Sequence, residues 1–403
     1  MNPDRGVRAA LVGSMLAGAA HCSRPHEPPA ADAGSAPAAV VLEAPPTTAP
    51  SIALHNLDAE IADREKRSLA GEPDAPIELV GRYLMRAKFV GRVSDLLAAD
   101  AASAKLVATR DGDAKAHLTR AGALSAIHEF ASAQVELERA ATLKAEAPDV
   151  ARERASILLA IGREDEAAAL LPAPVEGAPA SELAMRGGIE ARLGHAAESD
   201  RLFRLARERY RDVSPFSVAW LDFEHSRALE LAGDRADARA YLAEAAAVMP
   251  TYAHAVVHLA ALEPPERALS RLEALEKTSD DPDVLAGEAD ALRRAGRAPE
   301  AAAMLRRART RFDEVLAQLP KAYADHAASF FLGMGADPRR ALELARSNAQ
   351  NRPTDEAVEL WLTAAQAAAV SEDTCAAAAE ARALAHATSG LRERAASAAR
   401  GCP

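Results

Sequence analysis

Small and apolar residues recur at fixed distances along most of the chain. In one stretch Ala121 and Ala133 stand 12 positions apart, with Leu124 three positions after the first and Leu137 four positions after the second. The next stretch repeats this arrangement with alanines at 155 and 167 and leucines at 158 and 171. These spacings place each group on one buried face of a helix. The pattern therefore predicts successive pairs of helices that approach each other closely at their small residues.

The later small residue of each pair defines a period. This residue recurs at Ala99, Ala133, Ala167, Ser199, Ala238, Ala268, Ala301, Ala341 and Ala376. The mean step between these positions is close to 34 residues, and the individual steps are 34, 34, 32, 39, 30, 33, 40 and 35 residues. A glycine followed by polar residues precedes the second helix in several units, as at Gly162, Gly233 and Gly296. Such a glycine allows a tight turn between two helices. The longest steps predict extra residues at 212–219 and 313–321.

This period resembles that of tetratricopeptide repeats, which are helix–turn–helix units that stack into a superhelix. The resemblance covers residues 85–390 and about nine repeats. Pro179, Pro250 and Pro353 stand at the ends of units, where proline stops a helix, but the family's complete Trp-x-x-Leu-Gly-x-x-Tyr signature is missing, so the repeats are degenerate. The resemblance implies an all-α superhelical solenoid. Residues 51–84 are expected to form N-terminal capping helices and residues 391–403 a C-terminal capping helix and tail, because terminal repeats must cover an apolar face.

The N-terminus has the features of an export signal. Arg5 and Arg8 precede an uncharged stretch at 9–20 that is too short to span a bilayer and ends in small residues. Cys22 follows, so residues 1–22 resemble a bacterial lipoprotein signal, in which the cysteine thiol is acylated. His21 departs from that pattern, because the usual residue before the cysteine is small. We expect lipidation of Cys22, with cleavage after Ala19 or His21, or an uncleaved tail, as the alternatives.

Residues 23–50 contain seven prolines among alanines and have almost nothing to bury. This composition predicts a disordered, semi-extended linker. The linker would let a folded domain stand off a membrane to which an acylated Cys22 is anchored, or it is a tail without a role.

Composition and charge narrow the possible functions. The 403 residues are 49% hydrophobic and only 4% aromatic, which favours a helical fold over a sheet-based enzyme core. The net charge of −11 argues against nucleic acid or an anionic membrane surface as the main partner. A membrane contact is expected only through the lipid anchor.

Two further cysteines flank a predicted turn near the C-terminus. Cys375 and Cys402 lie on either side of the turn at 387–390, so folding 376–386 against 391–400 brings both sulfurs to the same end. A disulfide there would stabilise the last hairpin by about 3 kcal/mol and would suit an oxidising compartment. Two unpaired thiols are the alternative.

The chain contains few candidates for catalysis. Phosphate-binding glycine loops, nucleophile elbows and Cys-x-x-Cys pairs are absent from the sequence, and no cofactor is expected. His254 and His258 have the i, i+4 spacing of a zinc pair, but the glutamate of a zinc protease is missing at Ala255 and no third ligand is evident. Packing or surface histidines are the ordinary interpretation. The aspartates at 280–283 are interpreted as a helix-capping turn rather than a calcium site.

The resemblance implies that the first helix of each repeat lines a concave groove that binds a protein or peptide. Its register places nine residues in that groove: Trp220, Phe223, Arg227, Asp290, Arg293, Tyr323, His326, Phe330 and Trp361. Aromatic anchors flanked by arginine are typical of peptide-binding hot spots. The alternative is that each aromatic residue fills a gap between neighbouring repeats.

These features favour a non-catalytic scaffold that is exported to the cell envelope and binds a protein or peptide partner. The first alternative is a metal-dependent hydrolase that uses His254 and His258 on a helical-repeat scaffold. The second is a cytoplasmic adaptor, which the linker and the cysteine placement disfavour.

Overall fold

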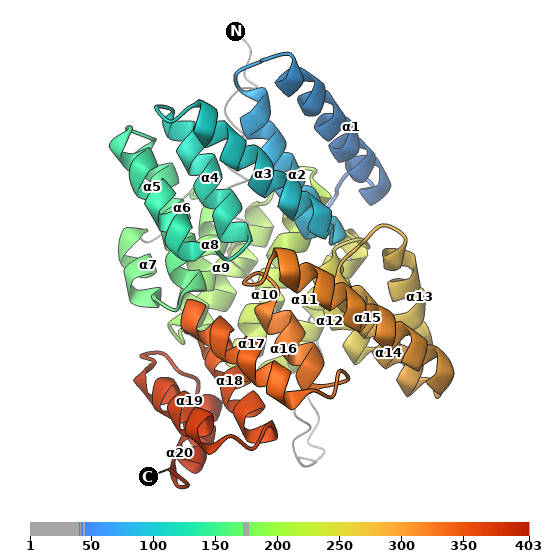
Figure 1. Cartoon of the computed structure of the whole chain (residues 1–403). Coiled ribbons are helices and arrows are strands. Elements are labelled where there is room, and N and C mark those ends of the chain that lie inside the picture. The colour runs from blue at the N-terminus through green and yellow to red at the C-terminus, as the bar shows by residue number, and fades with distance from the viewer. Residues whose placement is uncertain (1–39, 41, 43–44, 172–176, 403) are drawn as a thin grey trace.

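The computed structural model describes residues 40, 42, 45–171 and 177–402. The predicted signal peptide with Cys22, and most of the predicted linker, lie outside these residues. Within them the chain forms twenty helices and no strands (Figure 1), so the predicted all-α fold is confirmed. The helices are α1 (Pro50–Leu69), α2 (Ala75–Val90), α3 (Val93–Thr109), α4 (Ala114–Ala126), α5 (Phe130–Thr142), α6 (Ala147–Ala160), α7 (Glu164–Leu170), α8 (Ala180–Arg192), α9 (Ala196–Arg209), α10 (Pro215–Ala232), α11 (Arg235–Val248), α12 (Ala253–Leu262), α13 (Pro265–Glu276), α14 (Pro282–Arg294), α15 (Ala298–Gln318), α16 (Ala324–Leu332), α17 (Pro338–Asn351), α18 (Asp355–Ala367), α19 (Ser371–Ala383) and α20 (Ser389–Ala399).

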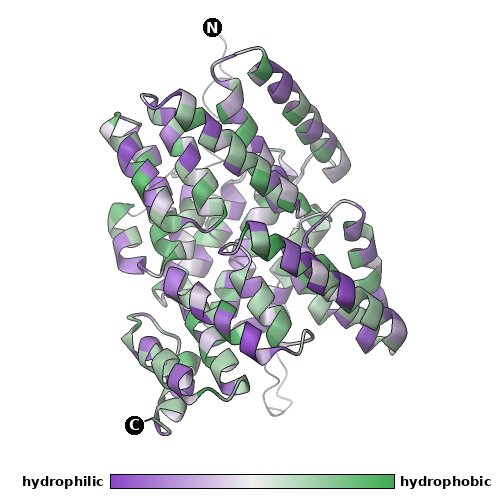
Figure 2. Ribbon diagram, viewed as in Figure 1, coloured by the Kyte–Doolittle hydropathy of each residue, from purple (hydrophilic) through white to green (hydrophobic). Residues whose placement is uncertain are grey.

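Consecutive helices pack as pairs, from α2 with α3 through to α18 with α19. Helix α1 packs on the first pair and α20 on the last. Small residues lie where the two helices of a pair meet: Ala133, Ala167 and Ala268 are completely buried. In the α8–α9 pair the Ser199 hydroxyl donates a hydrogen bond of 2.8 Å to the carbonyl oxygen of Gly187. Apolar and polar residues alternate along the helices (Figure 2), as expected when only one face of each is buried.

Local sequence explains how the helices begin and end. Gly233 ends α10 in the left-handed conformation, with φ of 84°, and the Asp234 side chain then accepts a hydrogen bond from the amide of Asp237 at the start of α11. The two long steps correspond to long helices, since α10 has 18 residues and α15 has 21. In the last pair the buried small residue is Ala377, whereas Ala376 is exposed, so the predicted register is off by one there.

The superhelix closes on itself. One apolar cluster joins Leu124 of α4 and Ile157 of α6 with Phe331 of α16 and Leu362 of α18. A second cluster joins α2 with α10 and α12, where the ring of Phe89 lies about 5 Å from the rings of both Phe216 and Tyr252, centroid to centroid (5.0 and 4.9 Å). The C-terminal helices therefore cover the inner face of the N-terminal ones. The orange helices of Figure 1 consequently pack against the teal ones.

Turns of the N-terminal half meet turns of the C-terminal half along a line that we call the seam. At its first point the carbonyl oxygen of Gly91 accepts hydrogen bonds from the Ser279 hydroxyl at 2.8 Å and the Asp280 amide at 3.1 Å. The Asp280 carboxylate also accepts a hydrogen bond from the amide of Val93, at the start of α3. Asp280 thereby caps a helix 187 positions away in sequence.

The seam continues past three further turns. Lys321 forms an ion pair with Glu129 at 2.6 Å, and the turn at Gly162 lies so close to the carbonyl of Pro353 that a Cβ on that glycine would overlap it. Further on, two ion pairs cross the seam: Arg192 with Glu356 at 2.5 Å and His386 with Asp165 at 3.0 Å. The first contacts described join residues 187 to 192 positions apart. One superhelical turn thus takes between five and six repeats.

The end of the predicted linker lies on the folded body instead of being free chain. The Val40 amide donates a hydrogen bond of 2.9 Å to Asp237, and the side chains of Val40 and Leu42 pack against Tyr241. The Thr48 amide donates to the carbonyl of Val213 at 2.7 Å, just before α1 begins. These contacts place residues 40, 42 and 48 of the predicted linker against the folded repeats.

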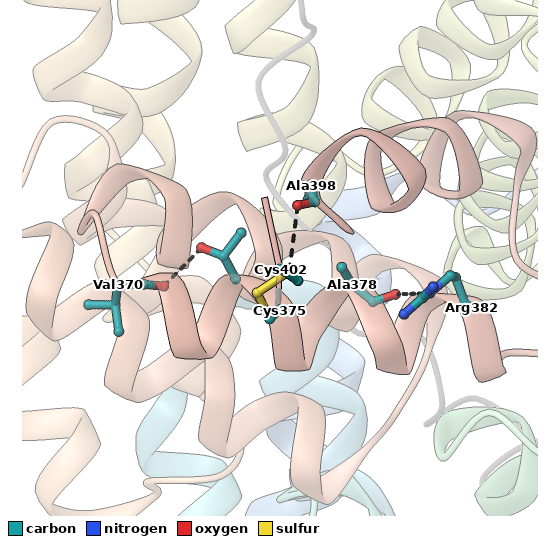
Figure 3. The surroundings of a disulfide bond; sticks show 7 residues. Val370, Cys375, Ala378, Arg382, Ala398 and Cys402 are labelled. Atoms are coloured by element: carbon teal, nitrogen blue, oxygen red, sulfur yellow. Dashed lines mark hydrogen bonds between the residues drawn. A yellow bond between two sulfur atoms is a disulfide. The ribbon is translucent and has the colours of Figure 1, made fainter. Parts of the chain in front are cut away.

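A disulfide joins Cys375 of α19 to Cys402, which follows α20 (Figure 3). Its sulfur atoms are 2.03 Å apart and the two Cα atoms 5.6 Å apart. The bond closes the last helical hairpin.

Candidate partner-binding surfaces

Five of the nine residues predicted to line the groove lie in the protein interior. Phe223 is 2% exposed, and the other four are between 6% and 9% exposed: Tyr323, His326, Phe330 and Trp361. The Trp361 indole N–H also donates a hydrogen bond of 3.1 Å to the buried Asp373 carboxylate. These five side chains therefore offer a partner little accessible surface in this structure. Their contacts are with neighbouring helices: Phe223 packs near His258 of α12, Phe330 packs on Phe312 of α15, and Trp361 contacts Asp373 of its own pair. This agrees with the alternative that each aromatic residue fills a gap between neighbouring repeats.

The other four predicted residues are accessible to different extents. Trp220 is half-buried, and the Lys88 ammonium lies 5.6 Å from its ring centroid. Arg227 forms an ion pair with Glu230 of its own helix. Arg293 is exposed and forms an ion pair of 2.8 Å with half-buried Asp290, one turn away in α14. The charged members are thus paired locally, which is typical of a solvated helix surface.

A buried group of ionisable side chains lies near the closed inner face. Burial alone would lower the pKa of His326, but the carboxylates of Asp283 and Asp325 outweigh that effect and raise it to about 10. His326 therefore carries a proton and forms a short contact with Asp283. The Tyr323 hydroxyl donates a hydrogen bond of 3.1 Å to Asp281, which also caps α14. Helix capping at 281 was predictable from sequence, whereas nothing local indicated the histidine–aspartate pair.

His254 and His258 do not complete a metal site in the part of the chain that the structure describes, where no group of three or more His, Cys, Asp or Glu side chains could hold an ion. Both rings pack near Phe223, at centroid distances of 6.5 and 5.9 Å. Burial, followed by the charge of His326, lowers the pKa of His254 to about 4. The His326 ring lies 5.8 Å from that of His254, centroid to centroid.

A cavity of about 290 Å³, which we call the seam cleft, lies along the seam. It lies between the α6–α7 and α8–α9 turns on one side and the segments before α18 and α20 on the other. Its ionisable side chains are the guanidinium of Arg192, the carboxylates of Glu164 and Asp355 and the imidazole of His386. The full lining is Gly162, Glu164, Ala191, Arg192, Gly194, Leu231, Pro353, Asp355, Leu384, Ala385, His386, Ala387, Thr388 and Ser389.

Among the described residues, no helix has the length and apolar character that crossing a bilayer requires. No protein-family profile matches the chain, and no curated protein matches it.

Three solved structures are similar to it in fold. The first is the crystal structure of the APC/C hetero-tetramer Cut9–Hcn1, at 13% identity and a TM-score of 0.46, covering 85% of this chain and 66% of that one. The second is Naa15/Naa10 bound to HypK-THB, at 12% identity and a TM-score of 0.26, covering 87% of this chain and 66% of that one. The third is the tetratricopeptide domain of P58(IPK), at 14% identity and a TM-score of 0.24, covering 86% of this chain and 98% of that one. The match thus spans just under two thirds of the first two chains. The fold, an all-α solenoid of stacked helix pairs, follows from this chain's own features: its period close to 34 residues, its paired helices and the small residues where the helices of a pair meet.

Proposed function

We propose that the protein is a non-catalytic scaffold of the cell envelope that binds a protein partner and is held at the membrane through an acyl group on Cys22. The observation that carries the proposal is the closed superhelix: cross-seam contacts at Gly91, Glu129 and Arg192 fix nine stacked helix pairs of the described chain into one body. Such a body presents a large and rigid surface, which reduces the entropy lost when a partner binds. The partner binds outside the closed inner face.

The C-terminal disulfide supports the envelope assignment. A bond between Cys375 and Cys402 persists in an oxidising compartment and is rare in the cytosol. It agrees with the export signal predicted at residues 1–22, which also requires passage out of the cytoplasm.

A metal-dependent hydrolase is the less favoured function. His254 and His258 would need a third ligand, and the described residues include no group of three or more His, Cys, Asp or Glu side chains that could hold an ion. Metal content after purification therefore belongs in the test of the proposal.

The test uses the full chain and a Cys22→Ala variant, expressed in a Gram-negative host. We expect an intact mass that shows acylation at Cys22, recovery in the membrane fraction, and loss of both in the variant. Crosslinking in intact membranes followed by affinity purification should recover the same partner protein in replicate preparations with the wild type.

Three results would overturn parts of this proposal. A mass that retains Met1 would remove the export assignment. Recovery of no partner from membranes or from the soluble fraction would remove the scaffold. One bound zinc per chain that disappears in His254→Ala, together with hydrolytic activity, would favour the enzyme.

A further inference from the structure

The segment before α1 lies along one side of the folded body. We call residues 40, 42 and 45–48 the strap. At one end the Val40 amide donates a hydrogen bond to Asp237, in the first turn of α11. At the other end the Thr48 amide donates one to the carbonyl oxygen of Val213, just before α10. Because α10 has 18 residues, its two ends are about 27 Å apart. The strap therefore follows the length of that helix.

The strap leads into an uncharged and partly apolar edge. Residues 45–54 contain no charged side chain, in a chain that is 27% charged. Ile52 is 54% exposed and Val213 is 57% exposed, and they are two of the four large apolar side chains that are more than half exposed among the described residues. The first turns of α1 and α10 pack in one buried cluster, so these two side chains lie on the same side of the body. We call residues 45–52 together with Val213 the apolar ridge.

The strap also brings the predicted lipid anchor to this side of the molecule. Cys22 lies 18 positions before Val40, and a proline-rich chain of that length reaches about 56 Å at about 3.1 Å per residue. A tether of this reach holds the ridge near the lipid at a high effective concentration. We propose that the apolar ridge contacts the surface of an uncharged lipid bilayer, with Ile52 and Val213 inserted at the interface. The inference rests on the proposed anchor at Cys22 and names the face of the protein that meets the membrane.

The chemistry of the ridge suits neutral lipid. Moving a half-exposed isoleucine or valine out of water favours the bound state by about three- to tenfold per side chain, which holds a tethered body but not a free one. Arg211 and Asp212, beside Val213, are exposed and carry opposite charges, so this edge has no net charge. The net charge of −11 opposes contact with an anionic surface.

The experiment attaches the full chain to vesicles through Cys22, so it does not depend on acylation in the cell. The disulfide occupies the other two cysteines, which leaves Cys22 to react with a maleimide lipid in phosphatidylcholine vesicles. The fluorescent residue dansylalanine replaces Val213 in one preparation and Val135 in the control, because Val135 is also an exposed valine, at 66%, but lies on α5. A spin-labelled lipid then quenches a dansyl group that lies at the bilayer surface.

We expect the emission at 213 to shift to the blue and to be quenched about threefold or more above that at 135. Ile52→Asp should lower the quenching at 213 by about twofold or more, and Val135→Asp should not change it. High salt should also leave it unchanged, because the ridge is uncharged. Equal quenching at 213 and 135, or none at 213, would overturn the inference. A blue shift at 213 that requires an added partner protein would assign the ridge to that partner and would overturn it as well.

The result is separate from the test of the broader proposal. If the exported protein carries no acyl group but position 213 is quenched on the vesicles, the anchor fails and the affinity of the ridge for lipid stands. If Cys22 is acylated in the cell but position 213 is not quenched, the anchor stands and the ridge does not contact lipid.

Discussion

Replacing Gly91 by alanine tests whether the seam holds the two halves of the superhelix together. Gly91 ends α2 with φ of +66°, and a Cβ there would lie 2.5 Å from the Ser279 hydroxyl and 2.7 Å from the Ala253 Cβ. The hydroxyl cannot move away without losing its hydrogen bond to the Gly91 carbonyl. Gly233 is the matched control: it ends α10 with φ of +84°, and no atom lies within 4 Å of its added Cβ.

The structure gives different costs for the two substitutions. Both place alanine in the left-handed conformation, which costs about 1–2 kcal/mol. Gly91→Ala adds the overlap across the seam, about 1–3 kcal/mol on the scale of overpacked sites. We expect the free energy of unfolding to fall by about 1–2 kcal/mol for Gly233→Ala and by about 2–5 kcal/mol for Gly91→Ala.

Urea unfolding followed by circular dichroism and by tryptophan fluorescence measures both effects. Trp220 and Trp361 lie in α10 and α18, so their emission reports on separate parts of the array. In the wild type the two signals should change together, because the seam couples the repeats. Costs for the two variants that agree within about 0.5 kcal/mol would refute the closed seam, since only Gly91 faces another turn.

Three further predictions concern two buried side chains and the C-terminal disulfide. Phe223→Ala should lower the free energy of unfolding by about 3–5 kcal/mol in the same urea assay. Arg293→Ala, at an exposed position, should change it by no more than about 0.5 kcal/mol. A cost below about 1 kcal/mol for Phe223→Ala would show that the Phe223 side chain is not buried. Burial raises the pKa of Glu153 to about 8, whereas in the unfolded state the carboxyl has its ordinary pKa near 4.5. Between these two pH values the folded state keeps a proton on Glu153 that the unfolded state releases. This contribution to stability is present at low pH and is lost as the pH rises toward 8. Glu153→Gln should therefore lose less stability than the wild type between pH 5 and pH 8, and parallel pH profiles would contradict this. Replacing both Cys375 and Cys402 by serine opens a loop with a sequence separation of 27 and should lower the free energy of unfolding by about 3 kcal/mol. Limited proteolysis of this variant should cut α20 first. An unchanged cleavage pattern would show that the disulfide does not hold that helix.

The helix pairs were predictable because their signals are local. Ala121, Ala133 and the leucines beside them lie within one hairpin, so their spacing in sequence reports directly on a contact in space. The glycine turn at 233 and the aspartate cap at 281 are local in the same sense. Errors of one residue, as at Ala376, arise where many neighbouring alanines make the register ambiguous.

The contacts across the seam depend on the rotation between neighbouring helix pairs, which no local pattern gives. Small rotations add up over the array, and after five to six repeats they bring one turn against another. Phe223 and Trp361 could be assigned to first helices, but their burial depends on how the neighbouring helices pack, as His258 packs near Phe223 and Asp373 contacts Trp361. Asp280 shows the same limit, because a capping aspartate is recognisable in sequence, whereas the helix that it caps lies 187 positions away.

The seam also constrains the order in which the protein can fold. Contacts within a helix pair span a few tens of residues and form early. The seam joins residues about 190 positions apart, so its contacts form only after the repeats on both sides have folded. At about 5–20 residues per second of synthesis, the apolar inner face around Leu124 and Ile157 stays uncovered for about 10–40 s before its partners emerge. The intermediate with half the repeats formed is the species most exposed to aggregation and proteolysis, and a chaperone would have most to protect at that stage.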